Sequence, residues 1–170
     1  MKPLHCILAI ASLAMAFPIA AGQRAPGATP YAVPNAVTDP LIPIYRGSGV
    51  RDDGGVDGTG IATAIHCTSF SGGTETVRLT IRNYDNTLLT QFSYNLPVQA
   101  TRTASTHFTN VFDEDFTLAT TAANQGYIAI HATSTNILCS AQVVDAASTS
   151  PSGWDLHLVR FNNMAGAAGE

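Results

Sequence analysis

The chain has 170 residues, of which 45% are hydrophobic, 12% are charged and 8% are aromatic. This length fits one domain, and a charged fraction about half the usual ~25% disfavours long solvent-exposed helices. Lys2 is the sole lysine, so beyond the N-terminal segment seven arginines face twelve carboxylates, a net charge of −5. This balance argues against non-specific binding to nucleic acid or to an anionic membrane, because both require a basic surface.

The first 22 residues have the composition of a secretory signal peptide. Lys2 precedes an apolar run over residues 4–17, and small residues follow at 20–22. The run is shorter than the roughly 20 residues that a membrane span needs. We therefore expect cleavage after Gly22, or one residue earlier, with no membrane span afterwards. The mature chain is then exported to the periplasm, the cell surface or the medium.

The cysteine count predicts one disulfide bond. Cys6 leaves with the signal peptide, and Cys67 and Cys139 remain in two strand-like apolar segments. An exported chain enters an oxidising compartment, where two remaining cysteines usually pair. The alternative is two buried free thiols that pack as small hydrophobic side chains.

Proline and glycine positions divide the rest of the chain. Residues 23–43 contain five prolines, which fix φ and lack a donor for a sheet ladder, so we expect an extended leader. Residues 44–162 form the predicted domain. Residues 163–170 are rich in alanine and glycine, and we expect a flexible tail.

The predicted domain is all-β. Val77, Leu79 and Ile81 alternate with polar residues, which places the aliphatic side chains on one face of a strand. Similar segments recur, separated by turn residues. Strands are predicted over residues 42–50, 61–70, 75–83, 88–96, 101–110, 127–132, 137–145 and 155–161. The long connection at 113–125 has room for a short helical turn. Seven or eight such strands favour a two-sheet antiparallel sandwich, immunoglobulin-like in outline.

Two marks of the true immunoglobulin family are missing. Trp154, the only tryptophan, follows the second cysteine instead of lying between the two. Ile137, and not tyrosine, lies two residues before Cys139, so the tyrosine corner is absent. We therefore expect the outline of that fold without membership of that family.

Four short segments carry a resemblance to known proteins. They are Gly-Val-Arg-Asp-Asp-Gly-Gly at 49–55, His-Cys-Thr at 66–68, Ala-Thr-Ser-Thr-Asn-Ile-Leu-Cys at 132–139 and Val-Arg-Phe-Asn at 159–162. With them, residues 45–162 resemble an uncharacterised family of small exported bacterial β-domain proteins. The resemblance implies an extracytoplasmic β-domain and supplies no activity, substrate or catalytic residue.

The sequence lacks the usual catalytic patterns. It contains no G-x-S-x-G motif, and a mature chain without lysine has no S-x-x-K motif, no Schiff-base lysine and no P-loop lysine. The contiguous acids at 113–115 do not have the separation across a cleft that glycoside hydrolysis needs. We therefore expect a protein that is not an enzyme and that needs no cofactor.

The acidic loops suggest calcium binding as an alternative function. Hard cations prefer several oxygen ligands on flexible, glycine-rich loops. With an immunoglobulin-like strand order, the loop at 51–60, the turn at 85 and the loop at 111–125 would meet at one end. The candidate ligands are Asp52, Asp53, Asp57, Asp85, Asp113, Glu114 and Asp115.

The histidines form no sequence-adjacent pair. We expect His66, His107, His131 and His157 at strand surfaces or half-buried, hydrogen-bonded to neighbours, and not as a zinc or copper site.

These observations predict an exported, non-catalytic module with a structural, adhesive or protein-interaction role. The partner is an unidentified protein or surface, and self-association through an edge strand is one version, because the predicted edges carry few charges. The alternative is a small exported domain that binds a ligand or calcium through its acidic loops.

Overall fold

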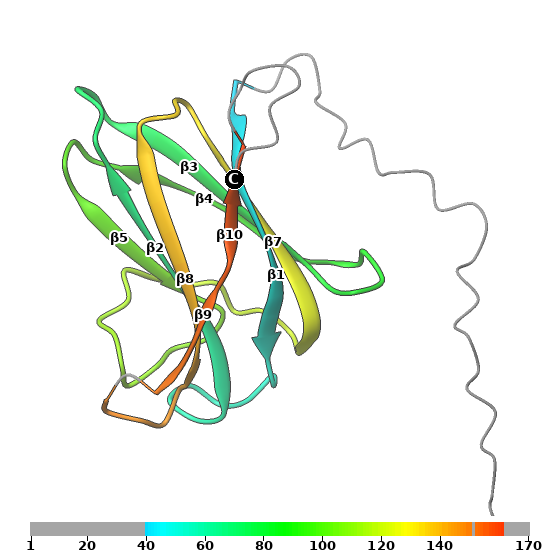
Figure 1. Cartoon of the computed structure of the whole chain (residues 1–170). Helices are drawn as coiled ribbons and strands as arrows, with labels where there is room; N and C mark the ends of the chain where they lie inside the picture. The colour runs from blue at the N-terminus through cyan, green and yellow to red at the C-terminus, as the bar shows by residue number, and fades with distance from the viewer. Residues whose placement is uncertain (1–39, 151, 162–170) are drawn as a thin grey trace, which may run out of the picture. The chain divides into compact units, whose positions relative to one another are not determined.

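A computed structural model describes residues 40–150 and 152–161 of the chain. The predicted signal peptide, residues 23–39 of the leader and the C-terminal tail lie outside the described residues. The described part contains ten strands and no helix (Figure 1). The strands are β1 (Ile42–Asp52), β2 (Ile61–Ser69), β3 (Glu75–Arg82), β4 (Leu88–Leu96), β5 (Thr101–Ser105), β6 (Phe116–Thr117), β7 (Ala123–Ala132), β8 (Ile137–Asp145), β9 (Gly153–Leu156) and β10 (Leu158–Arg160).

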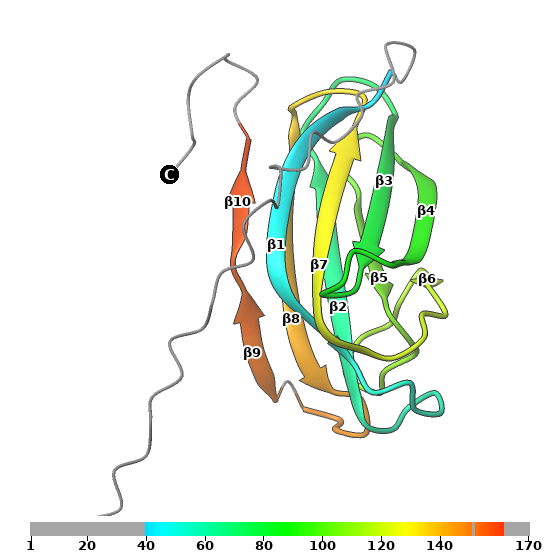
Figure 2. The same ribbon diagram turned by 90° about the vertical axis from the view of Figure 1, so that its right-hand side faces the viewer.

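The strands form two five-stranded sheets. The first has the order β10-β1-β7-β3-β4, and the second has the order β6-β5-β2-β8-β9. Neighbouring strands are antiparallel except β5 and β6, which are parallel. The two sheets stack as layers (Figure 2). The predicted all-β sandwich with one disulfide is confirmed. The strand number exceeds the expected seven or eight because the short strand β6 was not predicted and because one predicted strand is divided into β9 and β10.

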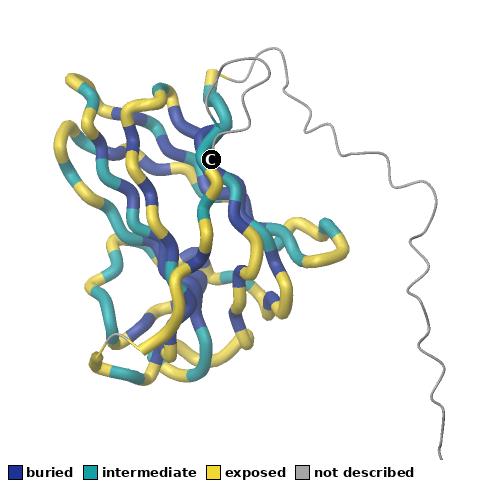
Figure 3. The backbone as a smooth tube through the Cα atoms, in the orientation of Figure 1, coloured by how far each residue is buried: buried dark blue, intermediate teal, exposed yellow. Residues whose placement is uncertain are grey.

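The core lies between the sheets, where the inward faces of the strands meet (Figure 3). Val77, Leu79 and Ile81 of β3 are fully buried, as the alternation predicts, and Ile128 and Ile130 of neighbouring β7 are buried with them. Each such side chain contributes roughly 1.5–3 kcal/mol by leaving water. Burial of this interdigitated layer holds the sheets together.

The predicted bounds of β4 and β8 agree with the structure, and those of β1, β2 and β3 differ by one or two residues at one end. β7 begins at Ala123, four residues before the expected start, and the connection at 113–125 contains β6 instead of a helical turn. Two other predicted strands differ more. The strand expected over 101–110 ends at Ser105, because the next side chains bind other segments: the Thr106 hydroxyl accepts a hydrogen bond from the Thr63 amide at 3.0 Å. The segment that follows lies over the outer face of the second sheet, where Phe112 packs on Ala62 and Val144.

The strand expected over 155–161 is divided between the two sheets. Its first part, β9, pairs with β8, and its second part, β10, pairs with β1. Where the chain passes from β9 to β10, it packs closely on β1: a Cβ on Gly47 would lie 2.6 Å from a methyl group of Leu158. This final segment therefore joins the two sheets along one lateral side of the sandwich.

Candidate functional site

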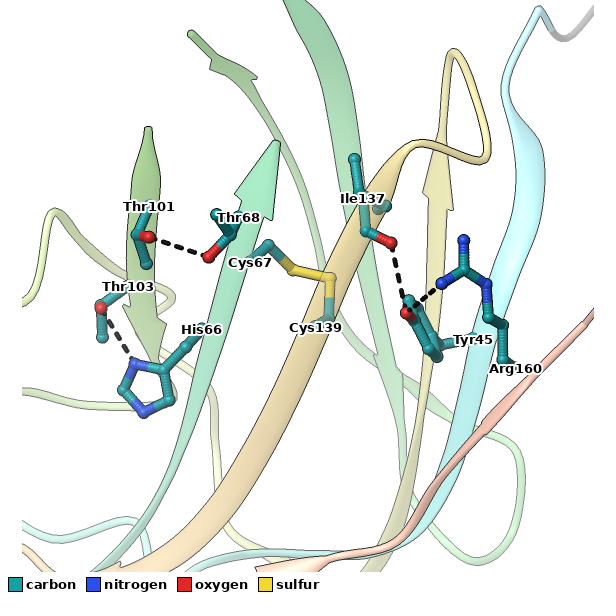
Figure 4. The surroundings of a disulfide bond; sticks show 9 residues. All are labelled: Tyr45, His66, Cys67, Thr68, Thr101, Thr103, Ile137, Cys139 and Arg160. Atoms are coloured by element: carbon teal, nitrogen blue, oxygen red, sulfur yellow. Dashed lines mark hydrogen bonds between the residues drawn. A yellow bond between two sulfur atoms is a disulfide. The ribbon is translucent and has the colours of Figure 1, made fainter. Parts of the chain in front are cut away.

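The disulfide joins two neighbouring strands of the second sheet. Cys67 of β2 and Cys139 of β8 are directly opposite in register, with a Cα–Cα distance of 4.2 Å, and both are buried (Figure 4). In antibody domains the equivalent bond joins the two sheets. Here the bond crosslinks β2 and β8, two adjacent inner strands of one sheet.

The seven candidate calcium ligands do not converge on one point. Among the described residues, one group of three or more His, Cys, Asp or Glu side chains has ligand atoms within 4.8 Å of one another, and it consists of Asp52, Asp53 and His107. The other five predicted acids are outside this group.

Asp52 and His107 instead form a buried hydrogen-bonded clamp. His107 Nε2 donates to the carbonyl of Thr59 at 3.0 Å, and its Nδ1 lies 3.0 Å from Asp52 Oδ2. Asp52 also accepts hydrogen bonds from the Thr120 hydroxyl at 2.9 Å and from the Gly54 amide at 2.6 Å. Both imidazole nitrogens have hydrogen-bond partners, and the arrangement ties the β1–β2 loop to residues 106–120.

Asp53 and Asp57 serve the same loop as acceptors for backbone amides. Asp53 accepts from the Gly55 and Ile61 amides, both at 3.0 Å. Asp57 accepts from the Phe108 amide at 3.2 Å. These bonds hold the backbone of the loop in place.

The remaining acids are distributed over two segments. Asp85 accepts from the Thr87 amide within the β3–β4 turn, and this hydrogen bond lowers the pKa of Asp85. Burial opposes ionisation of Asp115, but hydrogen bonds from the Thr103 amide and the Arg102 guanidinium, with the charge of Arg102, hold its pKa below the usual value. Glu114 accepts from the Thr109 amide, and Asp113 is exposed.

The other three histidines of the described residues, His66, His131 and His157, lie outside this clamp. His66 lies 3.0 Å from the Thr103 hydroxyl (Figure 4) and contacts the Phe112 ring edge-on. Burial lowers the pKa of His66, and the nearby Glu114 carboxylate offsets this only in part. His131 is buried and His157 is exposed between β9 and β10. Among the described residues, none of these three joins a group with metal-ligand spacing.

The edges of the sheets differ sharply in length. Of the four edge strands in the described part of the chain, β6, β9 and β10 have two, four and three residues. The fourth, β4, has nine residues. Natural proteins protect edge strands by shortening them or by placing lysine or proline in them. The short edges follow that rule, whereas β4 contains no charged residue and no proline.

The two faces of β4 are chemically distinct. Its inward side chains Phe92 and Tyr94 pack against Phe116, with ring centroids 5.2 and 5.0 Å away. Its outward side chains Gln91, Ser93 and Asn95 are exposed. The strand is thus anchored on one face by aromatic packing and offers a polar, neutral surface on the other. The sequence contained a signal for this edge in the uncharged run 88–96, but the neighbours that leave it at the sheet edge follow from strand order.

No family model, curated protein or solved structure matches this chain. Across residues 40–150 and 152–161, no helix has the length and hydropathy to cross a membrane.

Proposed function

We propose that this protein is an exported, non-catalytic β-sandwich module that acts through protein interaction, with β4 as its recognition element. The single observation that carries the proposal is the nine-residue, uncharged edge strand on a disulfide-crosslinked scaffold. A strand added to such an edge gains a row of main-chain hydrogen bonds, and alternate side chains give specificity. The aromatic packing of Phe92 and Tyr94 supports this role, because it holds the edge in a fixed position before a partner arrives.

The chemistry of the polar clusters is consistent with a binding role. Asp52, Asp53 and His107, the strongest candidates for a reactive centre, hold one another and the loop backbone. Their groups act as hydrogen-bond acceptors and donors for the β1–β2 loop, which supports a structural role for this cluster.

A photo-crosslinking amino acid in the producing cells tests the proposal. Placed at Ser93, on the exposed face of β4, it should form a covalent adduct with a protein. The matched control is the same amino acid at Ser140, an exposed position on inner strand β8. An adduct from Ser93 that is absent from Ser140 supports the proposal. No adduct from Ser93, or equal adducts from both positions, contradicts it.

A further inference from the structure

We infer that the partner of β4 is β4 of a second copy of this chain, paired antiparallel about a two-fold axis at Ser93. This inference rests on the proposed function and identifies the partner and the register. The geometry of the strand sets the centre of the pairing. A register shift between Ile81 and Arg82 disturbs the β3–β4 ladder near Leu88, and Pro97 follows the other end. The regular part is therefore 90–96, whose middle residue is Ser93.

The two-fold axis determines which side chains meet. An axis perpendicular to the sheet keeps inward residues inward, as a continuous core requires. Phe92 then lies opposite Tyr94 of the second copy, and Gln91 lies opposite Asn95 of the second copy. Aromatic pairs directly across an antiparallel ladder stabilise it by roughly 0.2–1 kcal/mol each, and the Gln91–Asn95 pair brings no like charges together. Each pair occurs twice, so the edge is complementary to itself.

The charges near the edge permit this pairing. In β4 itself no like charges meet, because the strand has none. The nearest outward charge in register is Arg78 of β3, which lies beside Ser93. In the dimer the two Arg78 side chains are three strand spacings apart, about 14 Å. This exceeds the Debye length of about 8 Å at physiological salt, so their repulsion is largely screened. A second copy therefore brings no like charges into direct contact along the outward face of β4.

Two double variants of the purified, disulfide-bonded chain test the partner and the register. Gln91→Lys with Asn95→Lys places lysine opposite lysine at two positions of the dimer. Gln91→Lys with Asn95→Asp places lysine opposite aspartate at both. The two proteins differ at one residue, and both altered side chains are exposed. Leu138→Lys with Ser140→Lys, on exposed positions of β8, is the charge-matched control.

Sedimentation equilibrium up to millimolar protein concentration is the measurement, with melting temperatures to show that each variant is folded. We expect dimers for the wild type and the β8 control. We expect at least a tenfold increase in the dimer Kd for the lysine–lysine variant, and recovery of the wild-type Kd for the lysine–aspartate variant. A monomeric wild type at every concentration overturns the inference. So does a lysine–lysine variant that dimerises like the wild type, or a lysine–aspartate variant that stays monomeric.

The crosslinking experiment separates this inference from the proposed function. An adduct from Ser93 with twice the mass of the chain supports both. An adduct of any other mass supports the proposed function and overturns the second copy as partner. The absence of an adduct contradicts both.

Discussion

The hydroxyl of Tyr45 connects the two sheets by donating a hydrogen bond to the carbonyl of Ile137, 3.2 Å away (Figure 4). Tyr45 belongs to β1 of the first sheet, and Ile137 begins β8 of the second. The same hydroxyl accepts a hydrogen bond from Arg160 of β10 at 3.2 Å, and that guanidinium lies 5.4 Å from the centre of the tyrosine ring. A buried polar bridge thus complements the aliphatic core at this end of the sandwich.

Removing this hydroxyl should lower the stability of the fold. We expect Tyr45→Phe to reduce the free energy of unfolding by about 1 kcal/mol, the usual net contribution of a hydrogen bond. Urea titration measures the change. Tyr84→Phe is the matched control, because Tyr84 is 71% exposed, and it should leave the midpoint unchanged. Equal effects at both positions would argue that the bridge contributes nothing.

Replacing His107 should have a larger effect. His107→Ala leaves the buried Asp52 carboxylate without its imidazole partner, and removing one partner of a buried hydrogen bond typically costs about 1–3 kcal/mol. A double-mutant cycle with Asp52→Asn isolates the coupling between the two side chains. We expect the double variant to lose clearly less free energy of unfolding than the two single variants lose together. Additive losses would contradict a direct pair.

The loss of folding stability at acidic pH should depend on Glu75. Burial opposes ionisation of this side chain, but hydrogen bonds from the hydroxyls of Ser134, Thr133 and Ser71 outweigh it and hold the pKa of Glu75 below its usual value. A lowered folded-state pKa adds stability above the unfolded value of about 4.3, and this stability is lost as the pH falls through the folded pKa.

Glu75→Gln is the test of that dependence. Wild type should be the more stable protein at pH 7, and its advantage should shrink as the pH falls below about 4.3. Denaturant midpoints of both proteins between pH 7 and pH 3 give the comparison. An advantage that stays constant over this range would show that protonation of Glu75 is not involved.

The disulfide should be a major source of stability. Cys67 and Cys139 are separated by 72 residues in sequence, and in the chain-entropy model a loop of this length is stabilised by about 4 kcal/mol. We expect reduction, or the double substitution to alanine, to lower the free energy of unfolding by an amount of that order. Denaturant unfolding with and without reductant measures it. An unchanged midpoint in fully reduced protein would contradict the expectation.

Calcium should leave the melting temperature unchanged. Carboxylate oxygens of Asp53 and Asp57 already accept backbone hydrogen bonds, and Asp52 is held by His107. A ligand that binds only the native state would raise stability by RT ln(1 + [L]/Kd). Thermal melts with chelator and then with excess calcium make the comparison. A rise of several degrees would support the calcium-binding alternative, and the same melt with zinc checks His107.

Local patterns predicted the parts of the fold that depend on local chemistry. The alternation of Val77, Leu79 and Ile81 indicated both a strand and its buried face, and the turn residues around β4 and β8 set their ends. The strand expected over 101–110 was too long, because the side chains of Thr106 and His107 bind segments more than 40 positions away. No local pattern contains those partners.

The candidate site residues were also predicted only where local patterns sufficed. The cysteine count indicated the bond between Cys67 and Cys139, but its location within one sheet depends on β2 and β8 being neighbours. The proposed gathering of acids assumed a strand order, and the structure brings together only Asp52 and Asp53 of the seven. Which uncharged strand lies at an edge likewise depends on long-range pairing.

The crossing of the final segment from β9 to β10 also limits the size of any assembly. This segment joins the two sheets on one lateral side, and β4 lies on the opposite lateral side (Figure 2). When two copies pair through β4, the long edge of each copy becomes buried in the dimer. Within residues 40–150 and 152–161, the other edge strands have at most four residues, so the dimer presents no second long edge from this part of the chain. Association through β4 therefore stops at two subunits and does not propagate into a fibre.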